Sequence, residues 1–394
     1  MKAMSPPRSI DLERLGLDRG AHLLIERALA SLPVGGRLEV TGKDPNLAVH
    51  LAGWCRAQGH QLDGTTIVKG AAGDERWAQA RRAGAPDPSA LVDQPDPEWG
   101  LAARGALVES GGPRPRFDLG ERAVVWSDVA PRLYAQGAAG QWDPATAIDW
   151  AGSPAPPSDI EDVVVQVMTY LVENEQAALV VPARFLARIH PYFREVVQLL
   201  ALQVADEARH VEVFTRRALL HGRALGISGA GGRASLQTLL EEPDFALASF
   251  LLSVLGEGSF LNLLSFIERY APDPATERVA HLALQDEARH VAFGVAHLEQ
   301  HARADPALLG RLRGAIERRH DSLKDTSGLN QQVFDALVVL AAGSWTPAAI
   351  EEGFARVQQL QADMDEGRRR RLTRLGFEPR EAEELSRLHT RNFM

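Results

Sequence analysis

The sequence of 394 residues contains a single cysteine, Cys55, which excludes an intramolecular disulfide. A lone thiol is typical of proteins in a reducing compartment, so we expect a cytoplasmic protein. Positive charge is also scarce, since 43 lysine and arginine residues stand against 52 acidic residues, for a formal net charge of −9. Nucleic-acid-binding proteins carry a basic surface, and this balance therefore argues against a nucleic-acid partner.

Long hydrophobic segments are nearly absent. The first sixteen residues lack the apolar core of a signal peptide. Residues 245–267 are long and apolar enough to span a bilayer, but Glu257 lies near their centre, where a charge is costly in lipid. A helix buried in a soluble bundle explains the same composition with fewer assumptions. We therefore predict a soluble protein without a membrane partner.

One phrase of five residues, Asp-Glu-Ala-Arg-His, occurs twice, at 206–210 and at 286–290. Each copy places Glu and His three residues apart, which puts both side chains on one face of an α-helix. A single pair of this kind is common on solvated helices, but two identical copies in apolar helices indicate a metal site. Two such helices, with one Glu from each of two partner helices, form the two-metal cage of ferritin-like bundles.

The first partner helix is predicted to begin at the capping signal of residues 158–161 and to end before Pro182. It carries two candidate acids. Glu175 lies on the apolar stripe, whereas Glu173 is about 200° away around the helix and is predicted to be solvated. A carboxylate on a core stripe requires a cation or another partner, which favours Glu175 as the ligand. The stripe consists of Val164, Met168, Leu171 and Ala178.

The second partner helix is predicted over residues 244–270 and contains the triplet Gly256-Glu257-Gly258. Glu257 shares a helical face with large apolar residues, and we predict that it is the second partner ligand. Glu268 is closer to the helix end and is predicted to lie at the surface. Glycines weaken helices, so we interpret Gly256 and Gly258 as substrate-pocket residues that leave room for O₂ or a substrate.

The predicted ligand set combines four hard carboxylates with two borderline imidazoles. Such a set binds iron or manganese well, and copper or structural zinc poorly. Imidazoles that bind metal usually donate their second N–H to a carboxylate. The set comprises Glu175, Glu207, His210, Glu257, Glu287 and His290.

The repeated phrase resembles the D-E-x-R-H motif of ferritin-like di-iron oxidases related to the ribonucleotide reductase small subunit. The resemblance implies that Asp206 pairs with His290 and Asp286 with His210, while Arg209 and Arg289 form ion pairs with these acids. Residues 142–150 (WDPATAIDW) are similar to the segment before the first bundle helix in that family, although a capping turn explains them equally well. The arylamine N-oxygenase branch adds a His where this chain has Ala283, which is a departure from that branch.

The first 75 residues have the alternation of a small two-layer α/β domain, with helices predicted at 21–32 and 47–58 and strands at 36–42 and 65–69. They resemble the TusA-type sulfur-carrier family. The resemblance rests on residues 11–17 (DLERLGL), 36–40 (GRLEV), 44–45 (DP) and 54–62 (WCRAQGHQL). The Cys-Pro-x-Pro motif of that family is replaced by residues 18–21 (DRGA).

No thiol is therefore available in the N-terminal domain at the position where the sulfur-carrier family needs one. Cys55 lies in a helical pattern beside Leu51 and Trp54, and we predict a buried structural thiol. We expect this domain to dock a partner or to pack on the rest of the chain.

Three other features are predicted to lie outside the metal site. His297 is two helical turns, about 10 Å, beyond His290 and is more typical of a core residue. His281 points away from the ligand face. The basic run 368–371 is interpreted as a solvated helix end, since the chain is acidic overall.

The sequence thus predicts a mainly α protein: a ferritin-like four-helix bundle with additional helices at 126–394, preceded by the α/β domain at 1–75 and a linker or irregular segment at 76–125. The predicted function is that of a non-haem di-iron oxidase or oxygenase that uses O₂ to oxidise a small organic substrate. Without a flavin, nicotinamide or iron–sulfur motif, electrons must come from a separate donor or from the substrate. The alternatives are an iron-storage or metal-sensing protein, and a manganese catalase or mixed Mn/Fe oxidase. The sequence is also compatible with a homodimer.

Overall fold

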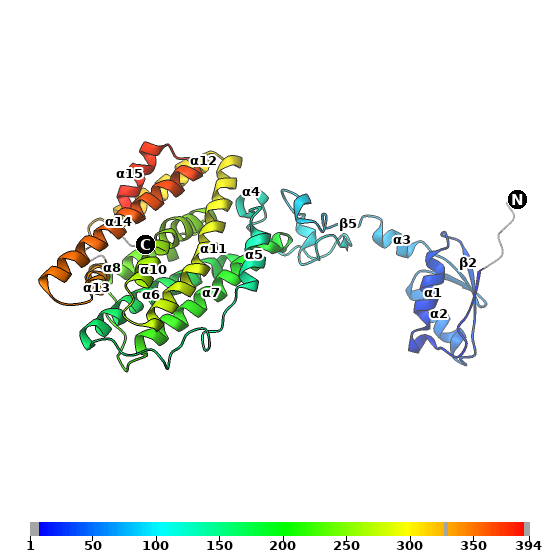
Figure 1. The fold of residues 1–394 in the computed structure, drawn as a ribbon. Coiled ribbons are helices and arrows are strands. Elements are labelled where there is room, and N and C mark those ends of the chain that lie inside the picture. The colour runs from blue at the N-terminus through cyan, green and yellow to red at the C-terminus, as the bar shows by residue number, and fades with distance from the viewer. Residues whose placement is uncertain (1–7, 327–329, 390–394) are drawn as a thin grey trace. The chain divides into compact units, whose positions relative to one another are not determined.

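The computed structural model describes residues 8–326 and 330–389 (Figure 1). The chain divides into two units, Met1–Ala90 with Ala102–Pro115, and Leu91–Leu101 with Arg116–Met394. Residues 76–125, predicted to be a linker or irregular segment, are divided between these units. The prediction of a mainly helical protein with a small N-terminal mixed sheet is confirmed.

The first unit contains a four-stranded mixed sheet with the order β1-β2-β4-β3. Strands β1 and β2 are parallel, and the other neighbours are antiparallel. Alternate side chains of β2 are buried and pack with the apolar faces of α1 and α2 in one core. The elements are β1 (Arg8–Asp11), η1 (Leu17–Arg19), α1 (Ala21–Ala30), β2 (Arg37–Thr41), α2 (Leu47–Ala57), β3 (Gln61–Asp63), β4 (Thr66–Val68), α3 (Ala72–Trp77), β5 (Arg81–Arg82), η2 (Pro88–Ala90) and β6 (Leu107–Val108).

Cys55 lies in the core of the first unit and is only 1% exposed. Burial raises the pKa of its thiol, which lowers the fraction of reactive thiolate. We expect the native protein to react slowly with thiol reagents and to carry no persulfide after treatment with a sulfurtransferase and its sulfur donor. Mass spectrometry of the intact protein measures this, with the unfolded protein as the reactive control. A persulfide on Cys55 would overturn the prediction of a structural thiol.

The second unit is built around four long helical elements (Figure 1). Helix α6 packs against α7, and α10 packs against α11. The four elements are α6 (Ser158–Leu186), α7 (Arg194–Leu219), the run α9 (Phe245–Ser249), η5 (Phe250–Glu257) and α10 (Gly258–Arg269), and α11 (Pro274–Ala304). The segment η5 is a π-helix, whereas the sequence predicts one uninterrupted α-helix there. Phe245–Arg269 is apolar enough to cross a membrane, and 83% of its most apolar window is buried inside the protein.

Shorter helices and a C-terminal group complete the second unit. They are η3 (Pro97–Trp99), α4 (Arg122–Val125), α5 (Ala130–Ala139), η4 (Pro191–Phe193), α8 (Ala230–Leu240), α12 (Ala307–Leu323), α13 (Gln331–Ala342), α14 (Pro347–Leu375) and α15 (Pro379–His389). Helix α14 packs against α10. Pro182 lies inside α6 and does not end it, because the buried face continues from Val181 to Phe185.

A buried ion triad ties three of the bundle helices together. Helix α6 begins at Ser158, as predicted, but without a side-chain cap. Glu161 is not part of a capping box. Its two carboxylate oxygens each accept a hydrogen bond of 2.8 Å from Arg217 on α7. Arg217 also donates to Asp273 at 2.6 Å, and Asp273 caps the start of α11 through the backbone N–H of Thr276. All three charged side chains are buried, so each depends on the others for compensation.

The basic run of α14 differs from its prediction as a solvated helix end. Arg370 is exposed and pairs with Glu366 one turn earlier. Arg368 is instead 1% exposed and donates to the hydroxyl groups of Ser386 and Ser259. Arg371 donates to the backbone carbonyl of Val254. Two of the four arginines therefore face the bundle, because the helix that carries them packs on α10.

Candidate metal centre

The structure brings the six predicted ligand side chains together in the interior of the second unit. None of them is more than 3% exposed. They come from all four bundle elements, with one acid from α6, one from the end of η5, and a Glu and His pair from each of α7 and α11. The six residues are Glu175, Glu207, His210, Glu257, Glu287 and His290.

The donors form two overlapping groups, and within each group the donor atoms lie within 4.8 Å of one another. Glu207 and Glu287 belong to both groups. Nδ1 of His210 is 3.4 Å from Oε2 of Glu207 and 3.3 Å from Oε1 of Glu287. Nδ1 of His290 is 3.0 Å from Oε1 of Glu207 and 3.4 Å from Oε2 of Glu287. Each shared Glu therefore turns one oxygen toward each imidazole, which is the arrangement of a bridging carboxylate.

Each group is completed by one acid that the other group lacks. Glu175 joins the group of His210, where its Oε2 lies 3.5 Å from the imidazole Nδ1. Glu257 joins the group of His290. The pattern is two terminal carboxylates, two shared carboxylates and one imidazole for each of two positions, which matches the composition of di-iron and di-manganese carboxylate sites.

The cluster carries buried polar atoms that have no hydrogen-bond partner within the described residues. They include both carboxylate oxygens of Glu207 and of Glu287, and Nδ1 of His210 and of His290. Oε1 of Glu175 and Oε2 of Glu257 are also buried without a hydrogen-bond partner. Buried groups of this kind are costly unless a cation compensates them. Two divalent cations would engage these atoms and offset the charge of four carboxylates, so the residues fit iron or manganese.

The electrostatics of the cluster show its need for positive charge. Burial raises the pKa of Glu175 and of Glu257 well above the usual range, and neighbouring glutamates add to the effect. Burial alone would lower the pKa of His210 and His290, but the surrounding carboxylates raise both well above the usual value. Protons and metal ions thus compete for the same atoms, and metal binding is expected to weaken as the pH falls.

Each imidazole is held from behind by the aspartate of the other repeat. Nε2 of His210 lies 3.2 Å from Oδ2 of Asp286, and Nε2 of His290 lies 3.2 Å from Oδ2 of Asp206. This is the crossed arrangement that the family resemblance implies. With the proton on Nε2, the lone pair of Nδ1 is available to a metal ion. The two aspartates therefore select the tautomer that can bind metal.

Arg209 and Arg289 each contact both aspartates. Nη2 of Arg209 donates to Asp286 at 2.8 Å and also to Asp206, and Nη2 of Arg289 donates to Asp206 at 3.2 Å and also to Asp286. Burial would raise the pKa of both acids, but their partners keep each pKa below its usual value. The partners are His290 and Gln141 for Asp206, and His210, Arg209 and Arg289 for Asp286. Both aspartates therefore stay ionised and able to orient the imidazoles.

Sequence reasoning missed three residues that support this network. Gln141 donates to Asp206 at 3.0 Å, and Nε1 of Trp142 donates to Asp286 at 2.9 Å. Gln203 donates to Oε1 of Glu257 at 3.0 Å. The sequence of the segment that starts at Trp142 indicates only a lead-in to the bundle. Gln203 lies four residues before a ligand on the same face of α7, and that spacing is a signal that could have identified it.

The structure corrects the interpretation of Gly258 as part of a substrate pocket. A Cβ atom at this position would lie 2.4 Å from Nε and 2.5 Å from Cζ of Arg371. Gly258 therefore leaves room for an arginine from α14 and not for O₂ or a substrate. Gly256 is buried inside η5, and its role in a pocket stays a prediction.

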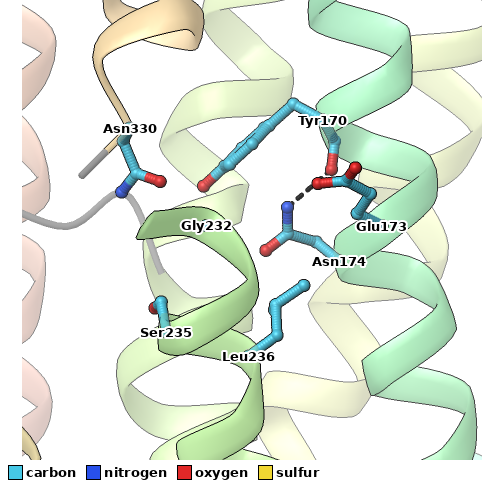
Figure 2. Close-up of a pocket in the computed structure, with 7 residues that line it drawn as sticks. All are labelled: Tyr170, Glu173, Asn174, Gly232, Ser235, Leu236 and Asn330. Atoms are coloured by element: carbon cyan, nitrogen blue, oxygen red, sulfur yellow. Dashed lines mark hydrogen bonds between the residues drawn. The ribbon is translucent and has the colours of Figure 1, made fainter. Parts of the chain in front are cut away.

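Glu173, the rejected candidate on α6, lies apart from the metal-capable groups. It is half-buried, not fully solvated as predicted, and it lines a small pocket with Tyr170 and Asn174 (Figure 2). His297 is a core residue, as predicted, and its Nε2 lies 2.7 Å from the carbonyl oxygen of Val124. His281 pairs with Glu268 at 2.9 Å.

Comparisons with known proteins place few constraints on this chain. No protein-family model matches it, and no curated protein matches it. It is similar to a solved R2-like ligand-binding oxidase from Sulfolobus acidocaldarius, with 19% identity and a TM-score of 0.40, over 65% of this chain and 94% of that one. It is also similar to an R2-like ligand-binding oxidase with an aerobically reconstituted Mn/Fe cofactor, with 17% identity and a TM-score of 0.41, over 67% of this chain and 91% of that one. The cofactor named there is a property of that protein.

Proposed function

We propose that the protein is a non-haem dimetal oxidase or oxygenase that uses two iron ions, or manganese with iron, and O₂ to oxidise a small organic substrate. The observation that carries the proposal is the pair of shared glutamates, Glu207 and Glu287, each of which faces both imidazoles. A pair of carboxylates in this position could hold two cations, which would together supply two electrons to O₂.

The residues of the chain would bind, orient and shield the metals. Two bound redox-active ions supply electrons for the reduction of O₂. Glu175 and Glu257 complete the two positions, and Asp206 and Asp286 fix the imidazoles in the tautomer with Nδ1 free. The burial of all six ligands excludes bulk water, which strengthens the electrostatic interactions in the site and limits side reactions.

The remaining parts of the proposal concern partners and location. Electrons come from a separate donor protein or from the substrate, and the protein acts in the cytoplasm without nucleic-acid or membrane partners. The N-terminal unit is proposed to be a TusA-like domain. Asp18 occupies the position of the sulfur-carrying cysteine, so the domain is proposed to dock a partner and not to carry sulfur. The strand and helix order of that unit, with two helices between strands of one mixed sheet, supports this proposal.

Oxygen consumption by the anaerobically loaded ferrous protein tests the proposed function. We expect rapid uptake of O₂, and we expect that one member of a panel of small apolar and amine substrates changes the uptake and yields an oxidised product. Uptake of iron far above two ions per chain would instead indicate storage. Rapid disproportionation of hydrogen peroxide by the manganese-loaded protein would instead indicate a catalase. Glu207→Ala is the matched control, because it removes a shared ligand.

A further inference from the structure

The π-helical segment η5 leaves one backbone carbonyl next to the metal ligand Glu257 without its α-helical partner. In an α-helix the N–H of Gly258 would bond to the carbonyl of Val254, four residues back. Here it is directed to the carbonyl of Ser253, five residues back. The Val254 carbonyl is therefore free to accept a different donor.

That donor comes from another helix. Nε of Arg371 on α14 donates to the Val254 carbonyl oxygen at 2.7 Å. Its guanidinium lies over Gly258, where a Cβ atom would come within 2.4 to 2.7 Å of three of its atoms. The absence of a side chain at 258 is thus a condition for the contact. Gly258 and Arg371 act as a matched pair, although they are far apart in the sequence.

The contact is not an ordinary ion pair. Among the described residues, no carboxylate lies within salt-bridge distance of Arg371. Burial, with the charge of the nearby Arg368, lowers the pKa of Arg371 to about 10, so the guanidinium is still protonated at neutral pH. A largely buried cation without a carboxylate partner is unfavourable. The hydrogen bond from Arg371 to the Val254 carbonyl therefore needs a structural role that offsets the cost of the buried charge.

That role concerns the register of η5. We propose that Arg371 is a positioning residue for the metal centre, which holds the π-helical turn open and so sets the position of the Glu257 carboxylate. Without Arg371, the N–H of Gly258 can return to the Val254 carbonyl. A change of register by one residue rotates a helical side chain by about 100°, which would turn Glu257 away from His290. The inference rests on the proposed function, because Glu257 is taken as a metal ligand.

Glu257 is held from two directions in this account. Gln203 on α7 donates to its Oε1 at 3.0 Å, while Oε2 has no hydrogen-bond partner within the described residues. Arg371 fixes the backbone that carries the side chain, and Gln203 fixes the carboxylate itself. The two contacts together hold Glu257 in the group formed with Glu207, Glu287 and His290.

The test compares Arg371→Met and Gly258→Ala with the wild-type full chain. Arg370→Met is the matched control, because Arg370 is the neighbouring residue and is exposed. Two readouts are measured. Amide hydrogen exchange of residues 250–258 in the metal-free protein reports the turn directly, and titration with Fe²⁺ under anaerobic conditions reports the affinity for each of two metals.

Arg371→Met and Gly258→Ala are expected to exchange more slowly over 250–258, because the α-helical bond from the Gly258 N–H to the Val254 carbonyl re-forms. Both variants are expected to bind the second metal about tenfold more weakly, with the first unchanged. Ala stabilises a helix more than Gly does. If helix stability alone decided the metal affinity, Gly258→Ala would not weaken it, so a weaker affinity in this variant points to the contact with Arg371. If Arg371→Met fails to fold, Arg371→Lys and Gly258→Ala carry the test, and the lysine variant should recover part of the affinity.

Wild-type exchange and wild-type affinity in both variants would overturn the role of Arg371. Equal loss in Arg370→Met would also overturn it, because that result would point to a general effect of charge on α14. A wild type that binds no metal contradicts the proposed function instead. The exchange comparison then still supports or overturns the contact between Arg371 and η5 on its own.

Discussion

Glu207→Ala is expected to abolish the binding of both metal ions, whereas Glu175→Ala is expected to remove only one. Glu207 contributes an oxygen to each of the two donor groups, but Glu175 contributes to one. The loss of this shared carboxylate leaves each position with two carboxylates instead of three, and the remaining imidazoles cannot replace it. Elemental analysis after anaerobic loading with Fe²⁺ and desalting measures the number of metals per chain.

Glu173→Ala is the control for these variants, since Glu173 lies on the same helix within two residues of Glu175 and belongs to neither donor group. We expect it to keep two metals per chain. Loss of metal in Glu173→Ala with retention in Glu175→Ala would show that the ligand on α6 is wrongly assigned. One metal retained in Glu207→Ala would show that Glu207 does not bridge.

Arg217→Met is expected to lower the free energy of unfolding by about 3–5 kcal/mol, because it leaves two buried carboxylates without their cation. Both oxygens of Glu161 and one oxygen of Asp273 accept hydrogen bonds from this arginine. Chemical denaturation of the metal-free protein measures the change. Arg223→Met is the control, since its pair with Asp162 is largely exposed and is expected to contribute less than about 1 kcal/mol.

The effect of Arg217→Met should also depend on pH. Burial raises the pKa of Asp273, but hydrogen bonds from Arg217 and Thr276 outweigh it and hold the pKa below its usual value. Stability from this group is therefore complete above about pH 4 and is lost as the pH falls through the lowered pKa. In the variant, protonation removes the unpaired buried charge of Asp273 and so reduces the loss of stability. The difference in the free energy of unfolding between the two proteins should therefore shrink as the pH falls toward 4. A difference that stays constant or grows would contradict the assignment of the triad.

The repeated phrase contains most of what can be predicted about this site. A spacing of three residues fixes which side chains share a helical face, and its duplication points to two facing helices. The apolar stripe distinguishes Glu175 from Glu173 because the period of an α-helix is regular. The structure places Glu175, and not Glu173, in the cluster. The same reasoning identified Glu257, although its helix is not a regular one.

The rest depends on contacts between distant parts of the chain. The π-helical segment around Val254 has no strong sequence signal, since a single carbonyl skipped by the hydrogen-bond pattern does not alter composition. Gly258 looked like open space because the sequence does not reveal that Arg371 fills it. Trp142 could not be placed against Asp286 from its neighbours alone. Tertiary packing decided each of these, and local periodicity does not encode it.

Anomalous X-ray diffraction from crystals of the protein loaded with Fe²⁺ or Mn²⁺ tests the central claim most directly. The account predicts two strong peaks per chain, both between the carboxylates of Glu207 and Glu287, with one beside Nδ1 of His210 and the other beside Nδ1 of His290. Absence of metal at these atoms, or a single ion bound there without a second, would contradict a dimetal centre.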